Sequence, residues 1–542
     1  MRISCLFFLL CFSFQAVAQK PVITNFSPFK GDVGTTVTIT GTGFDATATN
    51  NIVFFGGIKA VVNSATSSQL TVSVPLGAML APITVLNKTS LLSALSLASF
   101  TPTFSVANKK TIMGFDAKMD FNVGAKPVSE AIGDLDGDGK LDIAVLNNIN
   151  NTVSVLRNIG SNESISFADK VDFTTGSNPQ SVTMGDFDGD AKFDLLVTNM
   201  WDNTVSIYLN TSTIGNINFA SRINYSSDVN PAFAAVGDFD NDGKLDIAVA
   251  NYIEDYVTNE CTITLLRNTS NAIGNINFSF SPKLVTGKKP LSIVVGDLNV
   301  DGKVDLGVAN WQSNTVSIFT NSSSLGNINF YTKFDIATNE KPLFLSLADL
   351  DGDTKLDITV ANANTISVFK NNSTWNNLSF SSKNDFNPVS SPVSLAIGEI
   401  NGDGKPDIAV ATTASNGNQL SVFYNVSTTD GMSFDPREDL TSGTSPYQVL
   451  IADMNGDRKL DLVTVNYGSN TVSVLKNTPS FVNSIPPPSI SSFSPLSAKV
   501  GATVTINGTG FSTTNDNNIV FFGGIRAKVL TASSAKLEVE VP

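Results

Sequence analysis

The sequence predicts an all-β protein: seven four-stranded sheets in a closed ring, preceded by a small β-sandwich and followed by a truncated copy of it. Three observations favour this fold class. Hydrophobic residues make up 42% of the chain and charged residues 15%, with many of the β-branched and aromatic residues that favour strands. One unit recurs seven times in the middle of the chain. A second unit begins at Pro21 and again at Pro488.

The N-terminus is typical of a secretory signal peptide. An apolar run from Leu6 to Phe14 follows a basic residue, and small residues precede a cleavage site after Ala18. We expect residues 1–18 to be removed and the mature protein to be secreted or held at the cell surface. No later run approaches the ~20 apolar residues of a membrane span, so we expect a chain that does not span a membrane.

The unit at Pro21 predicts a small β-sandwich over residues 21–104, because short strands alternate with Gly-rich turns. The second copy, residues 488–542, aligns with it without gaps at an offset of 467 residues. That copy lacks the last third of the unit, so we expect the sequence to be a fragment or the product of an abnormal end. A Pro-rich linker, 478–487, precedes the second copy.

The central segment, 113–477, predicts a seven-bladed β-propeller. Each unit except the seventh contains four strand-like runs, the fourth being 165–173 in the first unit, and the units start 50 to 59 residues apart. The seventh unit lacks its fourth run, and a matching run stands at 114–121, before the first unit. We expect strand 114–121 to complete the last blade and close the ring, which leaves no free sheet edge.

An acidic loop joins the first two strands of every unit, as in "DLDGDGKLD" from Asp134. Oxygen ligands at positions 1, 3, 5 and 9, with a backbone carbonyl at position 7, suit Ca²⁺, which takes six to eight oxygens. An EF-hand would need Glu at position 12, where Val145 stands within a strand pattern. The sequence therefore predicts up to seven structural Ca²⁺ ions in strand hairpins.

The candidate metal ligands at positions 1, 3, 5, 7 and 9 of the seven loops are Asp134, Asp136, Asp138, Lys140, Asp142, Asp186, Asp188, Asp190, Lys192, Asp194, Asp238, Asp240, Asp242, Lys244, Asp246, Asp297, Asn299, Asp301, Lys303, Asp305, Asp349, Asp351, Asp353, Lys355, Asp357, Glu399, Asn401, Asp403, Lys405, Asp407, Asp453, Asn455, Asp457, Lys459 and Asp461.

The seven loops are not equivalent. A sharp turn at position 6 favours glycine, yet Ala191, Thr354 and Arg458 stand there in loops two, five and seven. A positive φ at a residue with a Cβ costs about 1 kcal/mol or more. Loop seven also has Asn455 at position 3. We expect loop seven to bind its cation most weakly.

The repeated units resemble FG-GAP/VCBS repeats, which form seven-bladed propellers related to the head of integrin α chains. The flanking units, with "FSP" followed by "GTGF" and "VFFGG", resemble IPT/TIG domains, which are immunoglobulin-like. Together the two resemblances cover nearly all of the mature chain. They imply a secreted or surface protein of bacteria, and little about activity, because propellers support many functions.

Composition excludes several functions. The chain has no histidine, which removes Ser–His–Asp and Cys–His catalysis and imidazole zinc sites. The net charge of −14 argues against nucleic acid as a partner. Cys261 alone remains after removal of the signal peptide, so no internal disulfide forms and the fold must be stabilised by core size or by metal ions. We expect a monomer.

The loops opposite the acidic loops carry aromatic residues beside Asn and Asp, a combination suited to glycan or protein ligands. The candidate ligand-binding residues are Trp201, Tyr252, Tyr256, Trp311 and Tyr467. The alternative is that these rings only cover the ends of the sheets. Trp375, on the acidic-loop side, is a weaker candidate.

Three function classes remain open. The first is a non-catalytic binding or adhesion protein, and the second is a calcium-stabilised spacer of a larger surface protein. The third is a polysaccharide-acting hydrolase or lyase. Nearly every clustered acid belongs to a metal loop. The remaining candidates for catalysis are Glu254 and Asp255, a lone pair in one loop, so we expect no enzyme activity.

Overall fold

The computed structural model describes residues 20–76, 78–103, 111–112, 114–161, 163–253, 260–387, 391–413, 418–427, 431–478, 480–481, 489–495, 497–515, 518, 520–522 and 525–541. The expected signal peptide, most of the linker, Glu254, Asp255 and Tyr256 lie outside these residues. The chain forms two compact units. The N-terminal sandwich and the ring make up the first, and residues 108–112 with 480–542 make up the second.

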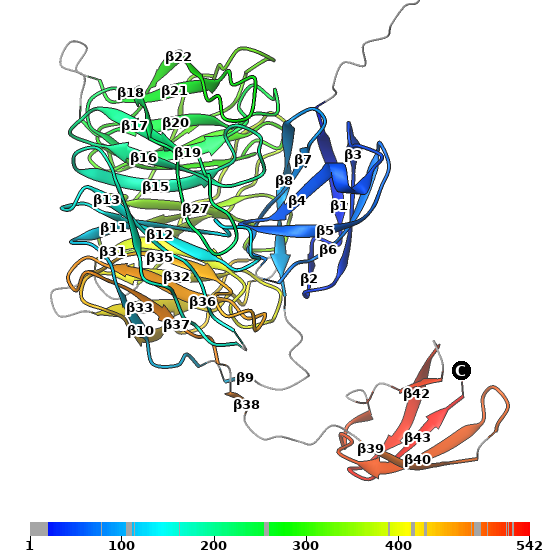
Figure 1. The fold of residues 1–542 in the computed structure, drawn as a ribbon. Coiled ribbons are helices and arrows are strands. Elements are labelled where there is room, and N and C mark those ends of the chain that lie inside the picture. The colour runs from blue at the N-terminus through cyan, green and yellow to red at the C-terminus, as the bar shows by residue number, and fades with distance from the viewer. Residues whose placement is uncertain are drawn as a thin grey trace, which may run out of the picture. The chain divides into compact units, whose positions relative to one another are not determined.

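The N-terminal sandwich contains eight strands, hydrogen-bonded in the order β1-β3-β6-β5-β4-β7-β8-β2 (Figure 1). Its elements are β1 (Val22–Ser27), β2 (Lys30–Gly31), β3 (Thr36–Thr42), η1 (Ala48–Asn50), β4 (Asn51–Phe55), β5 (Ile58–Ala65), β6 (Gln69–Ser73), β7 (Ala81–Asn87) and β8 (Leu92–Pro102). Alternate side chains face inward, as in β3, so Val37 and Ile39 are fully buried. Phe55 and Phe100 pack edge to face at the centre of this core, with ring centroids 4.9 Å apart.

The ring consists of seven four-stranded antiparallel sheets, which confirms the predicted fold class. Blades one to three contain β11 (Pro127–Gly133), β12 (Asp142–Asn147), β13 (Thr152–Leu156), β14 (Val171–Thr174), β15 (Pro179–Gly185), β16 (Asp194–Asn199), β17 (Thr204–Tyr208), β18 (Ile223–Ser226), β19 (Pro231–Gly237), β20 (Asp246–Asn251), β21 (Thr262–Asn268) and β22 (Phe278–Val285). Blades four to six contain β23 (Pro290–Gly296), β24 (Asp305–Asn310), β25 (Thr315–Phe319), β26 (Phe334–Ala337), β27 (Phe344–Ala348), β28 (Asp357–Ala361), β29 (Ile366–Phe369), β30 (Asn384–Phe386), β31 (Pro392–Gly398), β32 (Asp407–Thr412), β33 (Gln419–Phe423) and β34 (Glu438–Thr441).

Blade seven is assembled from both ends of the ring segment. It contains β35 (Pro446–Ala452), β36 (Asp461–Asn466) and β37 (Thr471–Leu475), with β10 (Met119–Asn122) as its fourth strand. Strand β10 pairs antiparallel with β37, from Met119 opposite Val474 to Asn122 opposite Thr471. The fourth strand of blade one is shorter than the run 165–173 suggests: β14 begins only at Val171, and Phe167 makes an isolated bridge to Asn158.

Each blade is joined to the preceding blade by one buried asparagine at the end of its third strand. The side-chain amide of Asn210 donates to the Phe193 carbonyl of its own blade and to the Leu135 carbonyl of blade one, both at 2.9 Å. The corresponding amide of Asn158 donates to the Met454 carbonyl of blade seven at 2.8 Å, which closes the ring. The seven bridging residues are Asn158, Asn210, Asn268, Asn321, Asn371, Asn425 and Asn477.

Glu130 breaks the apolar pattern of the inner strands. It stands three residues after Pro127, and the same place in the other six blades holds Val182, Ala234, Ile293, Leu345, Leu395 and Val449. Its side chain is 2% exposed and neither carboxyl oxygen has a hydrogen-bond partner among the described residues. Burial raises the pKa of Glu130 well above its ordinary value of 4.5. Burial without a hydrogen-bond partner or a counter-charge within the described part of the chain favours the protonated form of this carboxyl.

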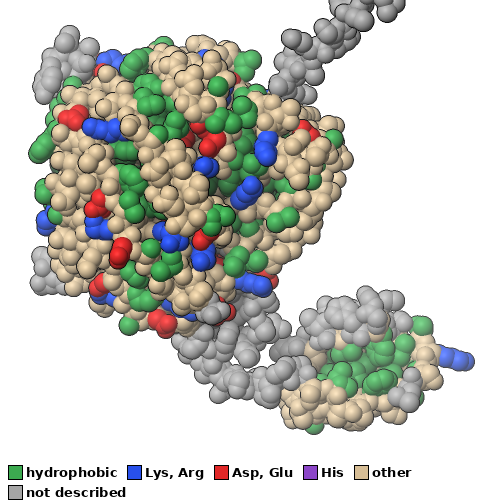
Figure 2. All heavy atoms as spheres, viewed as in Figure 1, with side chains coloured by type: hydrophobic (Ala, Val, Ile, Leu, Met, Phe, Trp, Pro, Cys, Tyr) green, Lys and Arg blue, Asp and Glu red, His purple; other side chains and the backbone are tan. Residues whose placement is uncertain are grey.

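The second unit contains a five-stranded sheet in the order β39-β40-β43-β42-β41. Its strands are β39 (Ser489–Ser494), β40 (Thr503–Thr509), β41 (Val520–Phe522), β42 (Ile525–Ala532) and β43 (Lys536–Glu540), and a short ladder joins β9 (Thr111–Ile112) to β38 (Ser480–Phe481). Figure 2 shows hydrophobic side chains gathered on one face of this module. Phe493 is 48% exposed, whereas Phe26, at the same place in the first copy, is 2% exposed.

Candidate functional site

The acidic loops fold around the carboxylate at position 1. In loop one, Asp134 Oδ1 accepts backbone hydrogen bonds from Gly137 and Asp138, at 2.8 and 3.1 Å, and Oδ2 accepts one from Gly139 at 3.0 Å. This tight turn needs positive φ at positions 4 and 6, where Gly137 has φ 81° and Gly139 has φ 87°.

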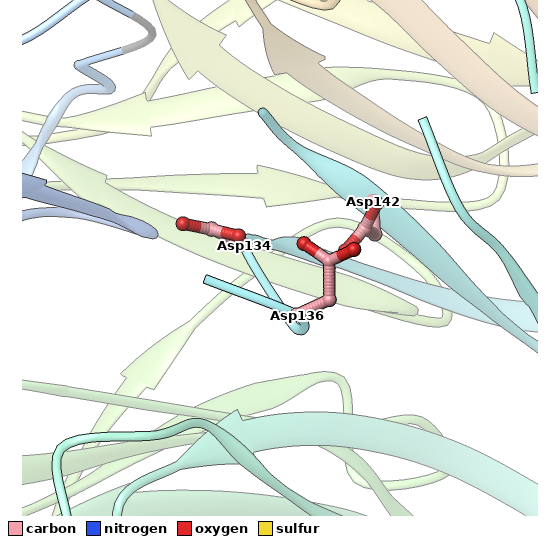
Figure 3. Close-up of side chains that lie close together, drawn as sticks. All are labelled: Asp134, Asp136 and Asp142. Carbon is pink, nitrogen blue, oxygen red and sulfur yellow. The ribbon is translucent and has the colours of Figure 1, made fainter. Parts of the chain in front are cut away.

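Three carboxylates converge in four of the described loops, with ligand oxygens within 4.8 Å of one another. Figure 3 shows the three carboxylates of loop one. In loops one to three these are positions 1, 3 and 9, and in loop five positions 1, 3 and 5. The clusters are Asp134, Asp136 and Asp142; Asp186, Asp188 and Asp194; Asp238, Asp240 and Asp246; and Asp349, Asp351 and Asp353. Each of these four clusters could hold a metal ion, because oxygen-only sites suit hard cations.

The position-5 carboxylate lies apart from the cluster of loop one. Asp138 Oδ1 accepts the backbone hydrogen bond of Lys140 at 2.9 Å, and its Oδ2 lies 3.7 Å from the Lys140 ammonium. The sequence predicted ligands at positions 1, 3, 5 and 9. In loop one only the carboxylates at positions 1, 3 and 9 form the cluster.

The position-9 aspartate is also a structural residue. Asp142 is fully buried. Its Oδ2 accepts a hydrogen bond from the backbone N–H of Leu135 at 2.9 Å, and its Oδ1 accepts one from the backbone N–H of Asn158 at 2.8 Å. It thereby joins the acidic loop to the end of the third strand. Burial raises the pKa of Asp142 to about 8, against the two backbone hydrogen bonds and with the help of Asp136 and Asp134.

The donor set of these loops fits a cation. Burial, together with the charges of Asp190 and Asp188, raises the pKa of Asp186 to about 7. Neighbouring carboxylates in a dry site must share protons or bind a positive ion. In loop six, Glu399 Oε2 is buried without a hydrogen-bond partner among the described residues, and burial raises the pKa of Glu399 to about 8. A bound cation would satisfy both features.

Basic side chains enter four of the loops from the residue that precedes the bridging asparagine. Arg267 pairs with Asp240 and, at 2.7 Å, with Asp242. The same place holds Arg157, which lies 3.9 Å from Asp136; Lys370, which pairs with Asp351; and Lys476, which lies 3.6 Å from Asp457. Loops two, four and six have Leu209, Thr320 and Tyr424 there.

Loop two is therefore the acidic cluster with no basic residue at that place. The alternation between basic and uncharged residues was visible in the sequence, directly before each bridging asparagine, but its meaning depends on the fold. An ammonium or guanidinium beside a ligand carboxylate competes with a metal ion. The basic residues therefore give a different order of expected metal affinity among the loops than the residues at position 6 do.

The turn residues divide into an expected and an unexpected group. At position 6, Ala191, Thr354 and Arg458 have φ of 70°, 73° and 74°, as the sequence predicted. Position 4 makes the same demand, which sequence reasoning missed: Asn241 and Val300 both have φ of 60° there. A β-branched residue in this region is strained, so Val300 weakens the turn of loop four.

The N-terminal sandwich covers the acidic-loop face of the ring. The Asp134 amide donates to the Gly57 carbonyl at 3.3 Å, and the Ser93 amide donates to the Gly243 carbonyl at 2.8 Å. Lys20 pairs with Asp238 of loop three and also bonds the Asn241 side chain. A chamber of about 630 Å³, lined largely by apolar side chains, lies between this sandwich and the inner strands.

The opposite face carries the aromatic residues. Trp201 is 72% exposed, while Tyr252, Trp311 and Tyr467 are half-buried. Tyr467 stacks on Tyr447, with centroids 5.8 Å apart. Tyr447 is itself 41% exposed. Tyr447 was not among the residues predicted for this face, and Tyr256 lies outside the described residues.

Three lysines lie over these rings. The Lys289 ammonium is 5.2 Å from the centroid of Trp311 and 5.4 Å from that of Tyr252, and Lys341 is 5.6 Å from Trp311. The Lys126 ammonium is 4.4 Å from Tyr467. Each lysine precedes the proline that starts its blade. Sequence reasoning missed them, although their place before the proline could have been noted. We call Lys126, Lys289 and Lys341 with Tyr252, Trp311, Tyr447 and Tyr467 the aromatic–lysine surface.

Seven four-stranded sheets in a ring, with an acidic turn in every blade, define a β-propeller whose blades carry candidate metal loops. The chain belongs to the FG-GAP-like repeat family, whose model matches residues 134–197, 192–249, 297–360, 349–410 and 400–464. The IPT/TIG domain model matches residues 21–105 and 488–542. Both resemblances drawn from the sequence are thereby confirmed.

The chain is also similar to several solved structures at low identity. An auxiliary nutrient binding protein from Bacteroides thetaiotaomicron is 12% identical, with 85% of this chain and 98% of that chain covered and a TM-score of 0.35. A lectin from Agrocybe aegerita, described as recognising non-reducing terminal N-acetylglucosamine, is 16% identical, with 72% and 95% covered and a TM-score of 0.41. A functionally unknown protein from Desulfotomaculum acetoxidans is 15% identical, with 67% and 96% covered and a TM-score of 0.39. Likenesses at this level do not carry functional inference.

No curated protein matches the chain. Within the part of the chain that the structure describes, no helix has the length and hydropathy of a membrane span.

Proposed function

We propose that this protein is a secreted or cell-surface binding protein without catalytic activity. Its ring, stabilised by Ca²⁺, presents the face opposite the acidic loops to a glycan. The observation that carries the proposal is Trp201, which stays 72% exposed on that face although a tryptophan without a ligand gains by burial. The signal peptide expected over residues 1–18 is consistent with export.

Calcium would act as a structural ion, up to one for each of the seven loops. The carboxylates at positions 1, 3 and 9 would hold it in loops one to three, and position 3 is a neutral asparagine in loops four, six and seven. The ion would supply the positive charge that the buried carboxylates lack. The chain itself already fixes the geometry, because backbone amides hold Asp134 and Asp142 in place.

Non-catalytic binding is preferred to hydrolysis because the acids that cluster among the described residues are committed. Asp142 and its counterparts each accept at least two backbone hydrogen bonds, and Asp240 and Asp351 pair with basic side chains. A catalytic acid pair needs two carboxyls free to reach a substrate.

A glycan array with the full chain, loaded with calcium, tests the proposal. We expect at least one glycan to be bound and the signal to fall in Trp201→Ala and Trp311→Ala. Trp375→Ala is the matched control, since Trp375 is 73% exposed but lies in a turn that bonds the acidic loop of Asn299. Binding retained in both variants would contradict this ligand face. Binding of proteins but no glycan would assign the face to a protein ligand, and no binding at all would favour the spacer function.

A further inference from the structure

The aromatic–lysine surface contains three lysines whose ammonium groups, among the described residues, lie over aromatic rings rather than beside carboxylates. Among the described residues, Lys126, Lys289 and Lys341 form no ion pair with a carboxylate. Lysines elsewhere on the ring behave differently. On the outer strands, an aspartate two residues further on pairs with Lys118, Lys170, Lys333 and Lys383.

The backbone holds these three lysines in a fixed and unusual conformation. Their φ angles are 55°, 55° and 56°, in the left-handed region that residues with a Cβ rarely adopt. The Lys126 amide donates to the Asn470 side chain and the Lys341 amide to the Asn314 side chain, both at 2.8 Å. The Lys289 carbonyl accepts the Trp311 amide at 3.0 Å. The residue before the blade proline has a positive φ in the other four blades too, at Asn178, Asn230, Ser391 and Ser445, so this conformation belongs to the repeat and fixes where the three lysines stand.

Two described aspartates near this surface are engaged elsewhere. Asp202 accepts the Ser177 amide at 2.8 Å, and Asp228 pairs with Lys283 at 3.0 Å. Glu340, next to Lys341 in the chain, is exposed. The chain has a net charge of −14, yet much of the acid is gathered in the loops on the other side of the ring.

We propose that the aromatic–lysine surface binds an acidic glycan, with Trp311 stacking on a sugar ring and Lys289 and Lys341 contacting its anionic groups. This inference rests on the proposed function and names the ligand class of the same face. Two ammonium groups lie within 5.6 Å of the centroid of one tryptophan ring, so an anionic group on a sugar that contacts this ring has two cations near it. The anionic group can be a uronate carboxylate or a sulfate ester, since an ammonium recognises both as a point charge.

The two sources of charge are separated by the choice of probe. Titration calorimetry with the calcium-loaded full chain compares polygalacturonate with its methyl ester, and dextran sulfate with dextran. We expect binding to the acidic member of at least one pair and at least tenfold weaker binding to its neutral partner. The affinity falls as the salt concentration rises from about 50 to 500 mM, because exposed charges are screened.

Substitutions locate the site. Lys289→Gln and Lys341→Gln are expected to weaken binding by about tenfold each, and Glu340→Gln to strengthen it. Lys333→Gln, which removes a paired lysine on an outer strand, is expected to leave it unchanged. Unaltered melting temperatures show that the variants are folded.

Equal affinity for acidic and neutral glycans, or binding indifferent to Lys289→Gln and Lys341→Gln, would overturn the inference and leave the proposed function standing. Failure to bind any glycan, acidic or neutral, would overturn the proposed function itself.

Discussion

The two faces of the ring are built from the same seven repeats but differ in what their side chains do. On the acidic-loop face, nearly every carboxylate is fixed by backbone amides, and the N-terminal sandwich lies against the loops. On the other face, Trp201 is exposed and three lysines lie over aromatic rings without carboxylate partners among the described residues. The repeat thus supplies stability on one side and leaves the other free to vary.

Removal of calcium is expected to have the largest effect, and only on the acidic-loop face. Each ion adds about 2.7 kcal/mol at a hundredfold excess over its Kd, so excess EGTA should lower the melting temperature by at least about 10 °C. Calorimetry with and without EGTA measures this. Loop two should contribute the largest share of the calcium-dependent stability. Asp188→Asn should therefore reduce the calcium-dependent rise in melting temperature more than Asp457→Asn does, because Lys476 and Lys459 already lie beside Asp457. A melting temperature that does not change in EGTA would refute the structural calcium.

Breaking the ring closure should destabilise the protein whether or not metal is present. Asn158→Ala removes the bonds to the Leu141 and Met454 carbonyls and leaves both buried acceptors unsatisfied. The expected loss in the free energy of unfolding is about 2–3 kcal/mol, measured by urea denaturation in EGTA. Asn218→Ala, which removes an exposed hydrogen bond to Thr211, is the control. A loss of equal size in both variants would contradict the bridging role.

Replacing Glu130 by an apolar residue should stabilise the ring by about 1–3 kcal/mol. The pKa of Glu130 is raised by burial, so its contribution is fully present below pH 4.5 and is lost as the pH rises through the folded-state pKa. The gain of Glu130→Leu over the wild type should therefore be larger at pH 8 than at pH 5. Glu130→Gln removes the titration but keeps a buried polar group. A gain that did not depend on pH would show that the carboxyl is not protonated in the folded state.

A smaller gain is expected in loop four. Val300→Gly relieves the positive φ of 60° and should add about 1 kcal/mol to the free energy of unfolding. The matched change Val171→Gly, on a partly exposed outer strand, should destabilise instead. Urea denaturation of both variants would decide, and a loss in Val300→Gly would show that the side chain contributes more than the strain costs.

The smallest effect on stability is expected on the open face. Trp201→Ala should change the free energy of unfolding by less than about 0.5 kcal/mol, since the side chain is 72% exposed. The same variant should lose glycan binding. A large drop in stability would instead mean that the aromatic rings only cover the ends of the sheets.

Much of the acidic-loop face followed from the sequence, because its determinants are local. The spacing of Asp134, Asp136, Asp138 and Asp142 predicts a tight oxygen-lined turn, and the positive φ of Ala191 and Arg458 follows from their place in it. The cations within the loops did not follow, since Lys20 reaches Asp238 from 218 residues away and only the packed sandwich brings them together.

The two IPT/TIG copies show the same limit. Phe26 and Phe493 stand at equivalent places in nearly identical segments, yet their exposures are 2% and 48%. Phe26 is buried because Phe100 of β8 packs near it, with centroids 6.4 Å apart, and no described strand of the second copy corresponds to β8.

The sequence by itself determined the strands, the seven blades, the closure by residues 114–121 and the acidic turns, because periodicity, repeats and turn chemistry are local properties. Only the tertiary structure decided which carboxylates converge, which of them meet a basic side chain, and which face the sandwich covers. It also placed Lys289 and Lys341 over Trp311, since that arrangement needs two neighbouring blades. These contacts depend on surfaces that meet only when the ring has closed.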